Sequence, residues 1–337
     1  MMNWVYERIV LVKKACSEVN LENVAIFIPM EYKSAVLIKE LSKITNVFPF
    51  VVDDPTIKKD ALEWLKANGI EVYKLDELKF VDANYYLDCA AVLIRKARKL
   101  GILDKVDGVV ELTKTGVDIL KKFKIKKAIS VDNSTIKGVG ENIYGTALGL
   151  LDGLLRLNIY LPDKTIAIVG FGRVGEGCAK ILKNLGCRVL VVEKDRIRQF
   201  VAKMQGFEVV DLKDALNADI VVTCVGDRAI INDEMIEYIK DGAILCNMSA
   251  VKDEIKFDLK PKKLGFIDKY EINSKHFYVV SGGYAINLAL GYGTAIDVMD
   301  RTFAAAVYAL EYVMKEEFEG LIDLPKEIEE KVLGLVV

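Results

Sequence analysis

Residues 165–193 read TIAIVGFGRVGEGCAKILKNLGCRVLVVE, and this stretch decides the fold. An apolar run typical of a buried strand ends at Gly170, and the glycine-rich segment up to Gly175 follows it. A helical segment then leads to a second apolar run that closes on Glu193. Strand, glycines, helix, strand and an acid about twenty residues on form the fingerprint of a dinucleotide-binding βαβ unit. The stretch therefore predicts a Rossmann domain.

Each part of this fingerprint has a physical role. Gly170 permits the tight turn, Gly172 lets the backbone approach a pyrophosphate, and Gly175 lets the helix pack closely on the strand. The helix N-terminus offers backbone N–H groups and the positive end of its dipole to the phosphates. Glu193 would accept hydrogen bonds from the adenosine ribose and repel a 2′-phosphate, which favours NAD over NADP. We expect NAD to contact Gly170, Gly172, Arg173, Val174, Gly175 and Glu193.

Three basic residues, Lys194, Arg196 and Arg198, crowd the turn that follows Glu193. Such residues could form a pocket for a 2′-phosphate, but a charge run of this kind is more often a solvated face. We interpret them as a solvated positive face.

The totals of the sequence exclude several function classes. A chain of 337 residues is long enough for two domains. A net charge of −2 gives no electrostatic reason to expect nucleic acid or an anionic membrane as a partner. Six scattered cysteines without a CxxC pair, and a single histidine, predict reduced thiols in a cytoplasmic protein and no metal site. Few glutamines beside abundant Lys and Glu suggest a thermophile.

The chain outside the fingerprint also alternates between strand-like and helix-like segments. Short apolar runs near 23–30, 47–52 and 84–89 are separated by helical patterns, which indicates a second α/β unit with a parallel sheet. We expect a substrate-binding domain formed by residues 1–142 and 287–337, and a Rossmann domain formed by residues 143–286. Long helices near 141–158 and 285–315 would connect them, and the cleft between the domains is the default active site.

Six segments resemble the S-adenosylhomocysteine hydrolase family. They are VDNSTIKGVGENIYGTALGLLDGL (131–154), GFGRVGEGCAKILKNLGCRVLVVEKD (170–195), IKDGAILCNMSAVKDEI (239–255), NLALGYGTAIDVMDRTF (287–303), PMEYKSAVLIKEL (29–41) and VELTKTGV (110–117). The resemblance implies a bound NAD that takes hydride from the substrate's ribose 3′-hydroxyl carbon. Homocysteine then leaves, water adds, and the reduced cofactor returns the hydride.

The resemblance also implies roles for individual residues. Lys137 stands at the family's catalytic lysine, Asn142 at the asparagine beside it, and Glu141 replaces an aspartate that binds the ribose hydroxyls. These three residues are the expected catalytic group. The implied cofactor contacts outside the fingerprint are Thr113, Thr115, Thr223, Asn247 and Asn287.

Several positions depart from the family pattern. Histidines of the family are replaced by Pro29, Met235, Ala250 and Thr294, a glutamate by Leu112, and an aspartate by Cys89. A threonine and a glutamine of the base pocket become Glu31 and Lys33. General acid–base groups contribute roughly 10²–10⁴-fold each, so these losses predict a substrate other than adenosylhomocysteine.

Four hypotheses follow. The first is an NAD-dependent enzyme that oxidises a secondary alcohol, permanently or transiently, on another small substrate. The second is an NAD-binding regulatory or scaffold homologue without turnover, and the third is a divergent hydrolase of a related nucleoside thioether. A 2-hydroxyacid dehydrogenase is a more distant fourth, because His276 is poorly placed for it. A homo-oligomer is expected by family analogy.

Overall fold

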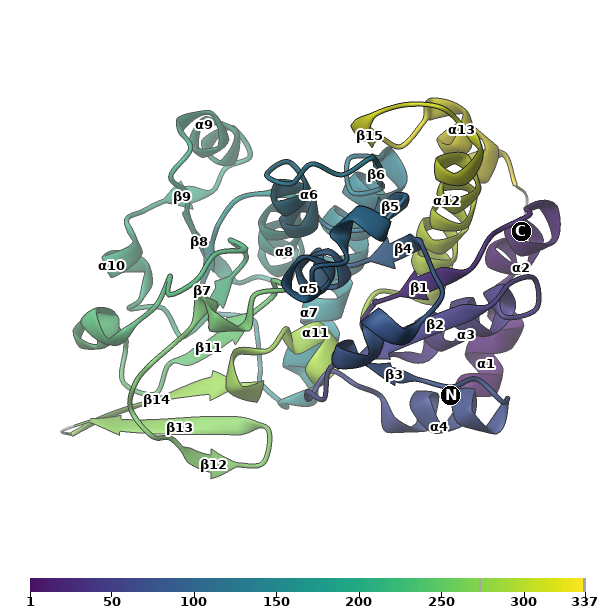
Figure 1. The fold of residues 1–337 in the computed structure, drawn as a ribbon. Helices are drawn as coiled ribbons and strands as arrows, with labels where there is room; N and C mark the ends of the chain where they lie inside the picture. Colours follow the sequence, from purple (N-terminus) through teal and green to yellow (C-terminus); the bar gives the residue numbers. More distant parts are fainter. Residues whose placement is uncertain (273, 336–337) are drawn as a thin grey trace. The chain divides into compact units, whose positions relative to one another are not determined.

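The computed structural model describes residues 1–272 and 274–335. Within them the chain forms two compact units (Figure 1). The first unit combines Met1–Glu141 with Ala295–Val337, and the second unit is the continuous segment Asn142–Thr294.

The first unit is built on a seven-stranded sheet in which every pairing is parallel. The strand order is β15-β6-β5-β4-β1-β2-β3. The bounds are Val24–Ile26 (β1), Val47–Val51 (β2), Tyr73–Lys74 (β3), Tyr85–Asp88 (β4), Gly108–Glu111 (β5), Lys127–Ser130 (β6) and Gly320–Asp323 (β15). Because β2 and β3 lie on one side of β1 and β4 on the other, the chain reverses direction across the sheet between β1 and β4. Open parallel sheets bind ligands outside the carboxyl ends of their strands at such a reversal.

Helices cover both faces of this sheet. One face packs on α1 (Met2–Arg8), α2 (Leu11–Glu18), α3 (Tyr32–Leu41), α4 (Lys59–Ala67), α12 (Ile296–Lys315) and α13 (Lys326–Gly334). The other face carries η1 (Leu75–Phe80), α5 (Val92–Leu100), η2 (Leu103–Lys105) and α6 (Lys114–Leu120). The alternating strands and helices expected from the sequence are confirmed here.

The second unit contains an eight-stranded sheet in the order β12-β13-β14-β11-β10-β7-β8-β9. The bounds are Thr165–Val169 (β7), Arg188–Val192 (β8), Glu208–Val209 (β9), Ile220–Thr223 (β10), Ile244–Asn247 (β11), Lys262–Leu264 (β12), Ile267–Ile272 (β13) and Lys275–Val280 (β14). The six neighbouring strands β14-β11-β10-β7-β8-β9 pair in parallel. At the other edge of the sheet, β13 pairs antiparallel with both β12 and β14. The parallel core is the Rossmann arrangement that the fingerprint predicts.

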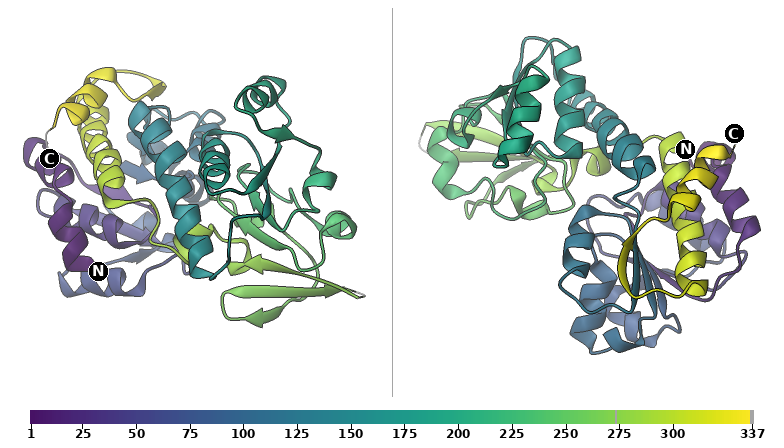
Figure 2. Two further views of the ribbon diagram at one scale, coloured as in Figure 1. Left: turned by 180° about the vertical axis from the view of Figure 1, so that it is seen from behind. Right: turned by 90° about the horizontal axis from the view of Figure 1, so that it is seen from above.

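The helices of the second unit also divide between the two faces. One face packs on α7 (Thr146–Arg156), α8 (Arg173–Asn184), α9 (Arg196–Met204) and α11 (Ile286–Ala289). The other face carries α10 (Leu212–Ala215) and η4 (Asp233–Tyr238), and the short turns η5 (Lys252–Glu254) and η6 (Ser281–Gly283) follow β11 and β14. Helices α7 and α8 lie side by side, as Figure 2 shows.

Two sequence predictions about helices were wrong in detail. The single helix expected over 285–315 is two helices, α11 and α12, because Gly293 adopts a φ of +67° and the chain turns between them. The helix expected at 141–158 begins earlier, as η3 (Ile136–Gly145), whose hydrogen bonds are π-helical, and continues as α7. Among the residues that the structure describes, no helix is both long and apolar enough to cross a bilayer.

Candidate functional site

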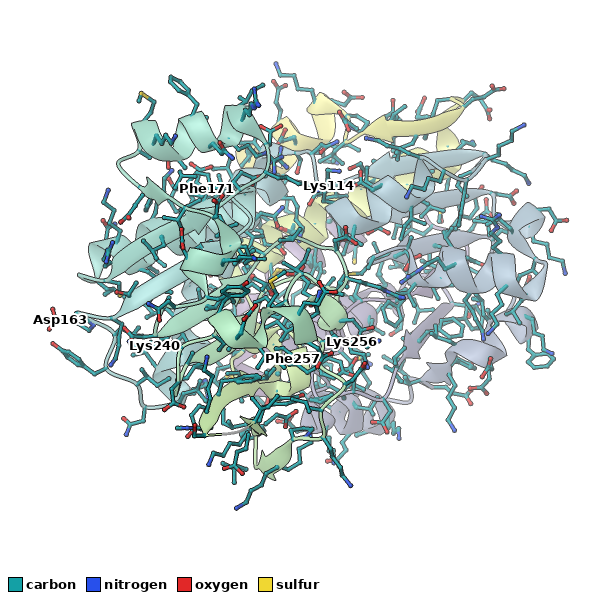
Figure 3. The ribbon with its side chains drawn as sticks, turned by 90° about the vertical axis from the view of Figure 1, so that its left-hand side faces the viewer. Lys114, Asp163, Phe171, Lys240, Lys256 and Phe257 are labelled. Atoms are coloured by element: carbon teal, nitrogen blue, oxygen red, sulfur yellow. The ribbon has the colours of Figure 1, made fainter. Side chains whose placement is uncertain are left out.

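The glycine-rich turn begins where β7 ends. Gly170 has a φ of +95°, a conformation that favours glycine, and its N–H donates to the Val192 carbonyl over 2.8 Å. A Cβ on Gly170 would also lie 3.0 Å from the Cys224 carbonyl oxygen. The next residue, Phe171, labelled in Figure 3, packs edge-on against Phe207 with 5.5 Å between ring centroids. The hydrogen bond to Val192 and the contact with Phe207 thus hold the end of β7 and the turn in place.

The other two glycines of the fingerprint shape the start of α8. A Cβ on Gly175 would overlap the Gly170 carbonyl oxygen, so only glycine lets the helix approach the turn this closely. Gly172 is the N-cap of α8 and provides no side-chain cap, and Arg173 and Val174 form its first residues. The first N–H groups of an α-helix have no acceptor within the helix, so this uncapped N-terminus suits an anion.

The Glu193 carboxylate lies directly beside this turn. Its Oε2 accepts a hydrogen bond from the Phe171 N–H over 2.7 Å, and its Oε1 accepts from the Lys194 and Asp195 N–H groups over 2.8 and 2.9 Å. An ionised carboxylate has about four lone-pair sites, so it can accept further bonds from ribose hydroxyls. Its position fits the role predicted from the sequence.

Thr223 and Asn247 end the neighbouring strands β10 and β11 in direct register. Both are fully buried, and the Thr223 hydroxyl donates to Asn247 Oδ1 over 3.4 Å. The Asn247 Nδ2 donates to the carbonyls of Val251 and Gly283 over 2.9 and 2.8 Å. Asn247 therefore ties together the loops after β11 and β14.

Asn287 lies on α11 and packs against α7. A Cβ added to Gly149 would lie 2.9 Å from the Asn287 Cβ, so glycine is needed for this approach. The Asn287 Oδ1 is buried and has no hydrogen-bond partner within the described residues. A buried acceptor without a donor is costly, and it suits the N–H of a ligand. This orphan oxygen, the open α8 N-terminus and the Glu193 carboxylate fit a dinucleotide in the second unit.

In the first unit, a buried ion pair lies on η3, just beyond the carboxyl end of β6. The Lys137 ammonium contacts Glu141 Oε1 one turn away, and both side chains are about nine-tenths buried. The Lys137 N–H donates to the Ser134 hydroxyl over 3.1 Å. Asn142 follows on the same helix and is half-buried. The predicted catalytic residues therefore occupy consecutive parts of one helix.

Two buried carboxylates end the strands β4 and β5. Asp88 and Glu111 stand opposite one another in register. Asp88 accepts from the N–H groups of Cys89 and of the first residues of α5, and Glu111 accepts from those of Ala90, Ala91 and Thr113. Burial raises the pKa of both carboxyl groups, and the charge of Asp88 raises that of Glu111 further.

This pair of carboxylates was not assigned a role from the sequence. In the sequence, an acidic residue ends each of two successive apolar runs, and this pattern could have pointed to the pair. The charges of both pairs, Asp88 with Glu111 and Lys137 with Glu141, act on the Cys89 thiol. Burial, with the Glu111 charge, raises the pKa of the Cys89 thiol well above its ordinary value, while the Lys137 charge acts in the opposite direction.

The two predicted cofactor threonines also belong to the first unit. Thr113 is the N-cap of α6, its hydroxyl donates to Glu111 Oε1 over 2.7 Å, and it accepts from the Gly116 N–H over 3.1 Å. Thr115 is half-buried on the first turn of α6. Thr113 is thus hydrogen-bonded to the buried carboxyl group of Glu111 in the first unit. The glycine fingerprint and Asn247 belong to the second unit.

A second buried ion pair lies beyond the carboxyl end of β1, next to the point where the strand order reverses. The Lys33 ammonium is 2.7 Å from Glu31 Oε2, and about a twentieth of each side chain is exposed. Glu31 is the N-cap of α3 and accepts from the Lys33 N–H over 3.1 Å. An ammonium and a carboxylate are thereby held side by side where a ligand of this sheet is expected.

Comparison with known proteins identifies relatives over almost the whole chain. Residues 142–294, the bounds of the second unit, match the S-adenosyl-L-homocysteine hydrolase NAD binding domain. The adenosylhomocysteinase of Thermotoga maritima is 30% identical, over 98% of this chain and 92% of that protein.

Two further relatives are named for a different substrate. An S-inosyl-L-homocysteine hydrolase of Methanopyrus kandleri is 34% identical over 69% of this chain and 60% of that protein. A second, from Methanocaldococcus jannaschii, is 32% identical over 67% of this chain and 58% of that protein. The matched domain gives NAD as the cofactor. The chain belongs to the S-adenosyl-L-homocysteine hydrolase family.

Proposed function

We propose that the protein is an NAD-dependent enzyme that oxidises a secondary alcohol of a small substrate other than adenosylhomocysteine. The observation that carries this proposal is the buried Lys137–Glu141 ion pair beyond the carboxyl end of β6. Burying two charges is expensive, and we infer a chemical use for an ion pair that is retained in this place. The first unit would bind the substrate, and the second would bind NAD.

The chemistry assigned to these residues is the handling of a proton. When bound, NAD accepts a hydride from the alcohol carbon. The Lys137 ammonium would stabilise the negative charge that builds on the alcohol oxygen. Glu141, in contact with Lys137, would accept the hydroxyl proton. Asn142, which follows Glu141, would orient the reacting groups.

The departures from the family pattern argue against adenosylhomocysteine as the substrate. The thiol of Cys89 stands where the family has an aspartate, and its raised pKa keeps it neutral near pH 7. A neutral thiol is a poor general base, and Pro29 and Ala250 carry no titratable group. The elimination and hydration steps of the family therefore lack several of their acid and base groups.

A second candidate is a hydrolase of a nucleoside thioether with a 6-oxopurine base. The Glu31–Lys33 pair favours it, because the ammonium only donates and the carboxylate only accepts hydrogen bonds. A 6-oxopurine edge presents an acceptor, O6, beside a donor, N1–H, and complements this pair. Adenine presents the opposite order. Two relatives named as S-inosyl-L-homocysteine hydrolases are consistent with this candidate.

The first experiment identifies the substrate class. The full chain is purified, its bound nucleotide is released and identified, and absorbance of reduced nicotinamide is followed with a panel of secondary alcohols. The panel includes inosine, adenosine and their homocysteine thioethers. Reduction of NAD by an alcohol supports the proposal. Free homocysteine from S-inosylhomocysteine would favour the second candidate, and no response to the panel would favour a regulatory homologue.

The second experiment tests the proposed role of Lys137. Lys137→Ala should lower turnover at least 100-fold, since a lost charge-stabilising group costs roughly that much, and should leave NAD affinity nearly unchanged. Lys315→Ala is the matched control, because Lys315 forms an exposed i,i+4 pair with Glu311. Equal turnover in the two variants would remove Lys137 from the mechanism.

Several predictions remain open to measurement. The domain bounds 1–142 with 287–337 and 143–286, a homo-oligomeric state, a cytoplasmic location and a thermophilic source stay predictions. Light scattering of the purified chain decides the oligomeric state, and thermal unfolding above about 90 °C would support the thermophilic source.

A further inference from the structure

The side chain of Arg198 lies beside the second glycine of the fingerprint. A Cβ built on Gly172 would lie 3.3 Å from Nη1 of the Arg198 guanidinium. Apart from the adjoining residues and the helix's own backbone, no other described atom comes within 4 Å of that point. The space that Gly172 leaves open is therefore faced by a cation.

The position of that cation is set by the start of α9, which is labelled in Figure 1. Asp195 is the N-cap of this helix, and its Oδ1 accepts a hydrogen bond from the Arg198 N–H over 2.9 Å. Asp195 in turn donates its own N–H to Glu193 over 2.9 Å. The acid of the fingerprint and the backbone of Arg198 thus belong to one hydrogen-bonded turn.

The guanidinium forms no ion pair with a carboxylate of the described residues. Within residues 1–272 and 274–335, the Arg198 side chain makes no hydrogen bond or ion pair with another side chain. The carboxylate of Glu193 is engaged by three backbone N–H groups instead. Arg198 therefore has no ion-pair partner among the described residues and lies beside a turn whose helix N-terminus attracts anions.

The chemistry of the two groups is complementary. A guanidinium presents five N–H donors in a planar fork that matches two oxygens of a phosphate. The backbone at Gly172 comes close to the pyrophosphate in this kind of fingerprint, because that glycine has no side chain. A diphosphate at this turn would lie within reach of both the α8 N–H groups and the Arg198 fork.

We propose that Arg198 binds the diphosphate of NAD and is a cofactor-binding residue that the glycine fingerprint does not include. Lys194 and Arg196 keep the role of a solvated positive face. The inference rests on NAD binding by the second unit and is independent of the substrate and of any turnover.

Binding of nucleotide fragments to the NAD-free full chain tests this inference by calorimetry. Arg198→Ala should weaken NAD and ADP-ribose roughly tenfold, since one charge-assisted contact is lost, and should leave adenosine unchanged. The affinity of the wild type for ADP-ribose should fall more steeply with salt than that of the variant. Arg198→Lys should show an intermediate loss, because it keeps the charge without the fork.

Arg196→Ala is the matched control. Arg196 lies on the same helix and is also exposed, and it does not approach Gly172 within 4 Å. An equal loss of ADP-ribose affinity in both variants would show a general field effect and overturn the inference. An equal loss for adenosine would indicate contact with the base or ribose and overturn it too. A loss for NADP that far exceeds the loss for NAD would assign Arg198 to a 2′-phosphate instead.

Discussion

Two turns of this molecule lead from a parallel strand into a helix, and they treat their backbone N–H groups in opposite ways. In the second unit, Gly170 enters the turn with a φ of +95°, and α8 begins without a side-chain cap. In the first unit, Ala90 and Ala91 adopt φ values of 58° and 50°. There the N–H groups are bound by the carboxylates of Asp88 and Glu111.

The difference separates a turn that receives an anion from a turn that already contains one. The glycine turn keeps its donors available and has a cation, Arg198, beside it. The alanine turn uses its donors on two carboxyl groups of the same chain, so a phosphate would meet carboxyl oxygens and no open N–H. Both turns join a parallel strand to the helix that follows it. Only the glycine turn has the properties of a dinucleotide site.

The largest expected effect comes from removing the internal anion. Glu111→Ala leaves the N–H groups of Ala90, Ala91 and Thr113 without their acceptor. We expect the unfolding free energy of the first unit to fall by about 3–5 kcal/mol. Urea unfolding followed by circular dichroism measures this.

The conservative variant serves as the control. Glu111→Gln keeps one acceptor oxygen and should lose clearly less stability than Glu111→Ala. If both variants lost the same amount, hydrogen bonding to the turn would not be the reason that Glu111 is buried.

A smaller effect is expected from closing the glycine turn. In Gly175→Ala the new methyl group overlaps the Gly170 carbonyl oxygen, so α8 must move away from the turn. We expect a destabilisation of about 2 kcal/mol, typical of overpacking, together with a marked loss of NAD affinity.

Calorimetry and thermal unfolding measure both effects. Gly334→Ala is the control, since a Cβ there meets nothing within 4 Å and should change neither quantity by much. Wild-type NAD affinity in Gly175→Ala would show that the close approach of helix and turn is not needed for binding.

The two turns should also differ in their response to pH. The pKa values of Asp88 and Glu111 are raised in the folded state, so the folded chain binds protons more tightly than the unfolded chain. Their contribution is fully present below the ordinary carboxyl pKa and is lost as pH rises through the raised values. The first unit should therefore become less stable between weakly acidic and weakly alkaline pH.

A pH series of urea unfolding measures this dependence. In Asp88→Asn one of the two titrating groups is removed and the slope should decrease. Stability that rose with pH over this range in the wild type, with the slope lost in the variant, would reverse the sign and contradict the assignment.

The smallest expected effect tests the backbone of the alanine turn. A non-glycine residue in the left-handed region costs about 1 kcal/mol, and Ala90→Gly relieves this cost at the expense of a more flexible unfolded chain. We expect a net gain of about 0.5 kcal/mol or less by thermal unfolding. Ala97→Gly, in the interior of α5, should instead lose about 1 kcal/mol.

The sequence predicts the glycine turn well because its information is local. Gly170 is required by its positive φ and Gly175 by the close approach of α8, and Glu193 follows at the expected spacing. The family resemblance, which the comparisons confirm, adds the expected roles of Lys137 and Asn247. Their roles in the reaction stay predictions.

The alanine turn could not be predicted in this way. Alanine is the strongest helix former, so Ala90 and Ala91 indicate a helix start rather than left-handed backbone. Asp88 and Glu111 are brought together only by the pairing of β4 with β5, which is a tertiary contact. The same holds for the approach of Arg198 to Gly172, which depends on the start of α9.

The discontinuity of the first unit has a consequence for the order of events on the ribosome. Helix α12 fills the core of that unit, β15 adds a strand beside β6, and the Asp300 carboxylate accepts the N–H groups at the start of α2. All three come from residues after Thr294, whereas the second unit is one uninterrupted segment. During synthesis the second unit is therefore complete while the amino-terminal segment of the first still lacks its central helix. Until α12 is made, the apolar face that it covers stays open, which makes this segment the intermediate most exposed to aggregation.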